Sequence, residues 1–156
     1  MLTIDIPGYK TLHLAHLVMD YNGTVAEDGK LVAGVGERLQ ILANDLEVHV
    51  ITADTFGFVQ QEVAGLPCRV SVIGPGDQAG AKLRYIQALG VEQTVCFGNG
   101  RNDRLMLQAA ALGIAVVLVE GAAAAALQAA DVITTSITAA LDLLLHPLRL
   151  TATLRS

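Results

Sequence analysis

Residues 17–25 constrain the fold most, because an apolar run there ends abruptly on a carboxylate. Such a run is typical of a buried strand whose last residue, Asp20, enters a loop. Gly23 then permits a turn that most side chains would forbid. Open α/β sheets bind ligands beyond the carboxyl ends of their strands, so Asp20 is a candidate nucleophile. In the alternative interpretation, Asp20 caps a turn and Asn22-Gly23 is only local turn sequence.

The rest of the chain alternates strand-like and helix-like segments. Strands are expected at 47–51, 69–73, 94–97, 114–119 and 131–134, and helices at 34–46, 56–64, 77–90, 104–112, 121–130 and 137–145. This alternation predicts an α/β fold, a Rossmann-like, doubly wound, three-layer α/β/α structure with a parallel sheet. The chain length fits a single domain over residues 1–156.

The N-terminal segment and the loop after Asp20 predict small additions to this sheet. Residues 2–6 and 11–19 flank a Pro7-Gly8 turn and are expected to form an opening hairpin. His13 and His16 are three residues apart and point to opposite faces of a strand, so a shared metal site is not expected. A small flap is expected near 25–32. No long insertion follows Thr52.

Composition and charge narrow the class of protein. Hydrophobic residues make up 53% of the chain and charged residues 16%, which favours a compact, heavily buried sheet. The net charge is −5 and no run of Lys or Arg occurs, so no nucleic-acid or anionic-membrane partner is expected. Cys68 and Cys96 lie in or beside apolar strands and are expected to be free thiols. With no leader-like N-terminal segment, we expect a soluble, cytoplasmic protein.

Polar residues follow several of the predicted strands and helix starts. In a doubly wound sheet, Asp20, Thr52, Lys82 and the 99–103 loop converge on one edge. Together they suit phosphoryl transfer: Asp20 attacks phosphorus, Thr52 hydrogen-bonds a phosphoryl oxygen, Lys82 neutralises charge, and Asp103 helps to hold Mg²⁺.

Each of these residues also has a purely structural interpretation. Thr52 could simply end a strand, Lys82 could be a solvated helix residue, and Asn102 could be a helix N-cap. Gly98-x-Gly100 after a strand could indicate a dinucleotide loop, but position 103 is Asp where the third glycine would stand. The joint occurrence of Asp20, Thr52, Lys82 and the 99–103 loop, in this order along the chain, favours the phosphoryl-transfer interpretation.

The sequence resembles the haloacid dehalogenase superfamily of aspartyl-phosphate enzymes. Residues 20–24, Asp-Tyr-Asn-Gly-Thr, resemble its first motif, Asp-x-Asp-Gly-Thr, at all fixed positions but the third. Thr52 matches the second motif and Lys82 the third. Residues 98–103 match the fourth motif, Gly-Asp-Gly-x-Asn-Asp, except at Asn99. The resemblance covers nearly the whole chain.

This resemblance implies Mg²⁺ as cofactor and a set of site residues. Asp20, Thr52 and Lys82 would be catalytic. Phosphate would be bound by Asp20, Asn22, Gly23, Thr52, Ala53, Lys82 and Asn102. The metal would be held by Asp20, Asn22, Asn99 and Asp103, with Asn22 acting through its backbone carbonyl.

Two departures from the family motifs affect the expected activity. Asn22 stands where many phosphatases of the superfamily carry the general acid and base, and an amide cannot exchange a proton near neutral pH, a loss of about 10²- to 10⁴-fold. Asn99 replaces a metal-binding Asp and brings no negative charge. P-type ion-pumping ATPases also lack an acid at the position that corresponds to Asn22, so the chain looks like a soluble relative of their phosphorylation domain.

The expected function is therefore that of a Mg²⁺-dependent phosphohydrolase or phosphotransferase working slowly through an aspartyl-phosphate on Asp20. Its substrate would be a phosphorylated small molecule or protein. Members of the superfamily with larger insertions use them as caps, so the resemblance implies only a minimal cap here, and either a bulky substrate or closure of the site by a neighbour in a homo-oligomer. An alternative is a catalytically inactive phosphate-binding or protein-interaction module. A receiver-like phosphoacceptor would also need Asp, Thr and Lys, but would not explain the Gly23-Thr24 turn or residues 98–103.

Overall fold

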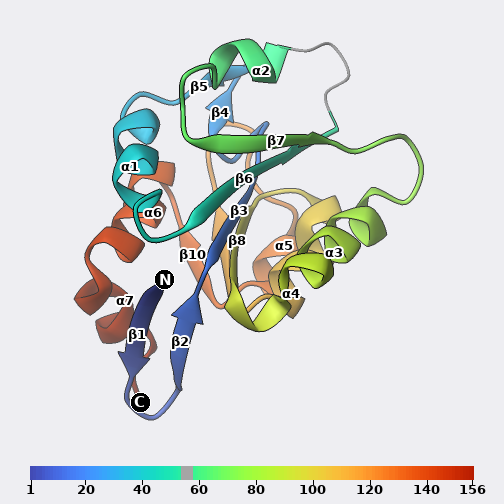
Figure 1. Ribbon diagram of the computed structural model, residues 1–156. Helices are drawn as coiled ribbons and strands as arrows, with labels where there is room; N and C mark the ends of the chain where they lie inside the picture. Colours follow the sequence, from blue (N-terminus) through green and yellow to red (C-terminus); the bar gives the residue numbers. More distant parts are fainter. Residues whose placement is uncertain (54–57) are drawn as a thin grey trace.

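A parallel sheet forms the centre of the computed structural model, which describes residues 1–53 and 58–156 (Figure 1). Its six strands lie in the order β10-β9-β8-β3-β6-β7, and every neighbouring pair is parallel. The strands are β3 (His16–Asp20), β6 (Glu47–Thr52), β7 (Cys68–Val72), β8 (Thr94–Gly98), β9 (Leu112–Val116) and β10 (Val132–Thr134). From β3 the chain adds β6 and β7 on one side of that strand, then crosses to the other side and adds β8, β9 and β10. Ligands of such sheets bind where the strand order reverses, and that point lies at β3.

Helices cover both faces of this sheet (Figure 1). One face carries α1 (Val35–Leu42), α6 (Ile137–Leu145) and α7 (Pro147–Leu154), and the other carries α3 (Gln78–Leu89), α4 (Arg104–Ala109) and α5 (Ala124–Ala129). Short 3₁₀ helices, η1 (Val91–Gln93) and η2 (Arg101–Asp103), precede β8 and α4. The hydrophobic core divides accordingly into two clusters. This arrangement confirms the predicted doubly wound α/β/α fold.

Strand β3 is buried on both faces of the sheet. Leu17 and Met19 belong to the core cluster beneath α1 and α6, whereas Val18 belongs to the cluster beneath α3 and α4. All three side chains are fully buried, as expected for a central parallel strand. Because side chains alternate along a strand, His16 and Asp20 point to the same face as Val18. Asp20 therefore ends the strand on the side of α3 and α4.

The N-terminal hairpin stands apart from the main sheet. It pairs β1 (Leu2–Ile6) with β2 (Lys10–Leu14) in antiparallel register. The single extended strand expected over 11–19 is wrong, because the chain leaves the hairpin at Ala15 and enters the main sheet as β3. The Ala15 amide donates to the Gln93 carbonyl at 2.8 Å, and the Ala15 carbonyl accepts from the Glu47 amide at 2.8 Å.

The predicted flap is present beside the Asp20 loop. It consists of β4 (Ala26–Glu27) and β5 (Lys30–Leu31), an antiparallel pair joined by a tight turn. The Tyr21 hydroxyl donates to the Gly29 carbonyl at 2.8 Å, and the Leu31 amide donates to Glu62 at 3.1 Å. Glu62 ends α2 (Phe58–Glu62), so the flap is fastened both to the Asp20 loop and to α2.

Several predicted boundaries differ from the structure. The helix expected over 34–46 ends at Leu42, and the strand expected over 114–119 lies at Leu112–Val116. Helix α7 begins at Pro147, where no further helix was expected. The first two residues of the helix expected over 56–64 lie outside the described residues. No one helix in the described parts has the length and hydropathy of a membrane span. Helices α6 and α7 together reach that length and hydropathy, but their axes are bent by 100°.

Candidate functional site

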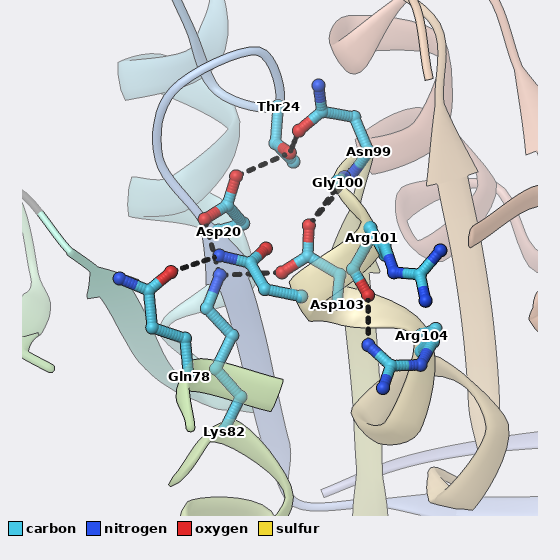
Figure 2. A network of polar contacts seen from close by, with 10 residues as sticks. Asp20, Thr24, Gln78, Lys82, Asn99, Gly100, Arg101, Asp103 and Arg104 are labelled. Carbon is cyan, nitrogen blue, oxygen red and sulfur yellow. Dashed lines mark hydrogen bonds and ion pairs between the residues drawn. The ribbon is translucent and has the colours of Figure 1, made fainter. Parts of the chain in front are cut away.

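The ammonium group of Lys82 lies between two carboxylates at the carboxyl edge of the sheet (Figure 2). Its Nζ donates to Asp20 Oδ1 at 2.7 Å and to Asp103 Oδ1 at 2.6 Å. The Lys82 and Asp103 side chains are completely buried, and that of Asp20 is 13% exposed. Lys82 thus meets one carboxylate from 62 positions earlier in the sequence and another from 21 positions later.

Lys82 reaches this position because α3 begins beside the sheet edge. The Asp77 side chain caps the helix and accepts a hydrogen bond from the Gly80 amide at 2.9 Å. This cap satisfies one of the free amides of the first turn. Lys82 then stands in the second turn with its long side chain inside the protein, so it is not the solvated helix residue of the structural interpretation.

Asp103 is held by the loop that follows β8. Its Oδ2 accepts from the amides of Asn99 at 3.0 Å and Gly100 at 2.8 Å, while its Oδ1 accepts from Lys82 (Figure 2). Hydrogen bonds to a charged partner such as the Lys82 ammonium are stronger than those between neutral groups. Both oxygens of Asp103 are engaged, so this residue orders the 99–103 loop and fixes the Lys82 ammonium.

The Thr24 hydroxyl joins Asp20 to Asn99. Its Oγ1 lies 3.2 Å from Asp20 Oδ2 and 3.2 Å from Asn99 Oδ1 (Figure 2). Asn99 Nδ2 donates to the Gly121 carbonyl at 3.1 Å. A hydroxyl has a single hydrogen to share between these two acceptor oxygens. A carboxylate and an amide oxygen that compete for one donor suit a hard cation such as Mg²⁺. The residues present therefore fit the predicted metal.

Burial and neighbouring charges perturb the titration of this site. Burial, reinforced by the Asp103 carboxylate, raises the pKa of Asp20 to about 7, although Lys82 and Thr24 act in the opposite direction. Burial would lower the pKa of Lys82, but the carboxylates of Asp20 and Asp103 outweigh it and raise that pKa. Lys82 is accordingly cationic at neutral pH, whereas Asp20 titrates there.

The other predicted site residues are placed around this centre. Thr52 ends β6 one residue beyond the register partner of Asp20 and is buried, and Ala53 follows it at the surface. Asn22 is exposed in the turn after Asp20. The Asn102 amide donates to Gln78 Oε1 at 2.9 Å, which ties the 99–103 loop to the first turn of α3.

Gly23 explains the close packing of the Asp20 loop and reveals a residue that the sequence reasoning missed. Its φ is 77°, and a Cβ there would lie 2.4 Å from Asn99 Nδ2 and 2.5 Å from Glu120 Oε2. Only glycine fits such a position without displacing a neighbour. The Glu120 carboxylate therefore lies beside Asn99, in the turn after β9. No motif marks it, because its place depends on the packing of that turn.

A surface pocket opens next to Asn22, between the flap and α2. Its volume is about 440 Å³, and it is lined by Asn22, Asp28, Gly29, Lys30, Phe58, Gln61 and Glu62. Ligand pockets commonly combine apolar walls with a few polar groups. Here Phe58, 61% exposed, supplies the large apolar side chain. The residues of α2 carry no sequence signal for this role.

Comparison of the sequence with known proteins gives a family and two relatives. The pattern of the haloacid dehalogenase-like hydrolases matches residues 80–140. An uncharacterized protein of Methanocaldococcus jannaschii is 40% identical over 84 residues, which are 51% of this chain and 90% of that protein. A second uncharacterized protein of the same organism is 49% identical over 39 residues, which are 25% of this chain and 89% of that protein.

Solved structures share the fold at low sequence identity. A 3-deoxy-D-manno-octulosonate 8-phosphate phosphatase from Moraxella catarrhalis, in complex with magnesium, phosphate and its sugar acid, superposes with a TM-score of 0.71 at 19% identity, over 85% of this chain and 86% of that one. A phosphoserine phosphatase in its apo form has a TM-score of 0.66 at 16% identity, over 85% and 98% of the two chains. With the family pattern and the parallel sheet, these findings place the chain in the haloacid dehalogenase superfamily.

Proposed function

We propose that this protein is a Mg²⁺-dependent phosphohydrolase or phosphotransferase that works slowly through an aspartyl-phosphate on Asp20. The observation that carries this proposal is the buried Lys82 ammonium, which lies 2.7 Å from Asp20 and 2.6 Å from Asp103. A buried cation fixed beside a strand-end carboxylate is the arrangement that phosphoryl transfer needs, because negative charge develops on the transferring oxygens.

In the first step, an Asp20 carboxylate oxygen attacks phosphorus and the bond from phosphorus to the leaving-group oxygen breaks. Lys82 neutralises charge on the equatorial oxygens, and the Thr52 hydroxyl donates to one of them. In the second step, water attacks phosphorus and releases inorganic phosphate, and Asp20 is regenerated. With an alcohol in place of water, the same step transfers the phosphoryl group.

Neither step has an acid or base at position 22, where the family motif carries a carboxylate. The leaving-group oxygen must be protonated and the attacking water deprotonated, but Asn22 carries an amide at the position expected for this role. The protons must then come from and go to bulk water. We expect a turnover about 10² to 10⁴ times slower than that of an otherwise equal site with a carboxylate there.

Magnesium, when bound, would neutralise charge on the transferring phosphoryl group. Its oxygen ligands would be the Asp20 carboxylate, the Asn22 backbone carbonyl and the Asn99 amide oxygen. Asp103 was expected among the ligands, but its hydrogen bonds to Lys82 and to two loop amides favour a positioning role for it. Glu120, whose carboxylate lies beside Asn99, would supply the negative charge that Asn99 lacks.

The pocket beside Asn22 supports a phosphorylated small molecule as substrate. Its volume of about 440 Å³ lies in the range of ordinary ligand sites. Lys30 at its rim brings a positive charge and Phe58 an apolar surface. Phosphate esters of sugar acids and of serine, named for the two similar structures, are a reasonable starting panel of substrates.

Beryllofluoride binding tests the proposal without a known substrate, because this reagent mimics a phosphoryl group on a carboxylate. We expect a rise in melting temperature that needs both Mg²⁺ and beryllofluoride, since a ligand that binds only the folded state stabilises it. The rise should disappear in Asp20→Asn. Each variant is compared with its own ligand-free protein, because Asp20→Asn alone changes the stability.

A second pair of variants tests the metal ligands. Glu120→Gln should weaken the Mg²⁺ dependence of the beryllofluoride effect, whereas Glu92→Gln, on η1 at the opposite end of β8, should leave it unchanged. Absence of any Mg²⁺-dependent shift in the well-folded native protein would refute the enzymatic proposal. It would favour the phosphate-binding or interaction module, in which Asn22 and Asn99 have ended turnover.

A further inference from the structure

A second polar cluster lies on the same face of the sheet as Asp20, but at the opposite end of the strands. His16 begins β3, Glu47 begins β6 as its register partner, and His49 follows two residues later. Alternation along the strands turns all three side chains to the face of Val18 and Asp20. At about 3.3 Å per residue, His16 lies roughly 13 Å from Asp20 along β3, too far to share its site.

The three side chains bring their metal-binding atoms together. His16 Nδ1 lies 3.4 Å from His49 Nε2 and 3.7 Å from Glu47 Oε2, and His49 Nε2 lies 3.8 Å from the same oxygen. These atoms form a nearly equilateral triangle. A point about 2.1 Å from all three lies at its centre, which is the distance at which Zn²⁺ binds imidazole nitrogen and carboxylate oxygen.

Neighbouring residues fix the imidazole of His49 in a suitable orientation. Its other ring nitrogen, Nδ1, lies 2.9 Å from the Tyr85 hydroxyl on α3, and this hydroxyl also accepts from Ser71 at 3.3 Å. A second hydrogen bond of this kind orients the ring of a metal-bound histidine.

The cluster is accessible from one side only. The His49 side chain is 2% exposed and that of His16 16%, whereas Glu47 is 55% exposed and leads to solvent. Arg69 on β7 is the nearby cation, with Nη2 3.9 Å from Glu47 Oε2, and its side chain is 75% exposed. An exposed ion pair of this length contributes little free energy, so Arg69 can move aside when a metal ion binds Glu47.

We propose that His16, Glu47 and His49 form a second metal site, which binds one Zn²⁺ or a similar first-row transition metal ion. Two imidazoles and one carboxylate select such a metal over Mg²⁺, which prefers oxygen ligands alone. The ion would join the first residues of β3 and β6, with solvent at its remaining coordination positions. The site has no common residue with the Asp20 centre and does not depend on the function proposed for it.

Zinc titration of the full chain by calorimetry, with Mg²⁺ in excess, tests this proposal. We expect one Zn²⁺ per chain and a raised melting temperature. Glu47→Gln, an exposed and nearly isosteric change, should weaken the affinity by more than about tenfold, and His16→Gln likewise. Tyr85→Phe should weaken it by about tenfold, because the His49 ring loses its orienting partner. His13→Gln is the matched control, since His13 lies in the hairpin and contacts Thr3.

Cobalt distinguishes this site from the Asp20 centre. Four- or five-coordinate Co²⁺ with imidazole ligands absorbs visible light far more strongly than six-coordinate Co²⁺ bound by oxygens. The absorption should persist in Asp20→Asn and disappear in Glu47→Gln. If native protein binds no Zn²⁺ at micromolar concentration, or if Glu47→Gln and His16→Gln bind it as native protein does, the proposal is wrong and these residues are a hydrogen-bonded cluster only.

Discussion

Replacing Lys82 by Met should destabilise the protein strongly at pH 8. Met fills nearly the same space without charge, so the substitution leaves the carboxylates of Asp20 and Asp103 facing each other. The Lys82 ammonium lies 2.7 Å from one carboxylate oxygen and 2.6 Å from the other, so these oxygens are at most about 5 Å apart. Two like charges at that separation repel by about 3 kcal/mol at an effective dielectric constant of 20.

This value agrees with the usual cost of removing one partner from a buried ion pair, about 3–5 kcal/mol. For a chain of this length, the melting temperature should fall by roughly 10 °C. The loss should be smaller at pH 5 by about 1–3 kcal/mol. The pKa of Asp20 is already raised to about 7 by burial and by Asp103, so at pH 5 this carboxyl is protonated in both proteins and the repulsion disappears.

Urea denaturation at pH 8 and pH 5 measures both quantities. Lys30→Met is the matched control, because Lys30 is an exposed residue of the flap and should lose less than about 0.5 kcal/mol. A loss below about 1 kcal/mol for Lys82→Met at pH 8 would refute the reasoning. So would an equal loss at the two pH values, since the repulsion depends on ionised Asp20.

Three further predictions concern single residues. Asp20→Asn should stabilise the protein at pH 8 by up to about 4 kcal/mol and hardly at pH 5. The folded state binds the Asp20 proton more tightly than the unfolded chain does, so the stability that this proton gives the native protein is lost as pH rises from about 4 to 7. Thermal denaturation of both proteins across this pH range would show the difference. Asn22→Asp should raise phosphatase turnover by about 10²- to 10⁴-fold once a substrate is found, and unchanged turnover would exclude the role given to this position. Gly113→Ala should cost more than about 2 kcal/mol in urea denaturation, because its Cβ would lie 2.3 Å from the Leu107 carbonyl oxygen, while Gly74→Ala, with open space around it, should cost little.

The sheet and its helices could be predicted because most strands carry their own signal. Residues 17–19 and 95–97 are apolar runs, and residues 48–51 are apolar except for His49. A polar residue follows each run directly or after one glycine, and segments of helical period lie between the runs. Burial on both faces produces such runs whatever the rest of the chain does. The hairpin was harder, since Ala15 gives no sign that one strand ends and another begins there.

The convergence of Asp20 and Lys82 at one edge of the sheet could be predicted from the order of the motifs along the chain. The individual hydrogen bonds of the site could not. Asp20 and Lys82 were expected at one edge, but the engagement of both Asp103 oxygens depends on the geometry of the 99–103 loop. Glu120 is placed by the turn after β9, and the proximity of His16 to His49 follows from the register of two strands. Such contacts between distant residues have no local sequence pattern.

The sharing of one lysine between two carboxylates also bears on the order in which ligands can bind. Asp20, Asp103 and Lys82 together carry one net negative charge when Asp20 is ionised. A phosphate dianion that approached this centre first would be repelled. A divalent cation that arrived first would reverse the sign of the local field and attract the phosphate. The charge arrangement therefore predicts ordered addition, with the cation before the phosphorylated ligand, and inhibition by free phosphate only when the cation is present.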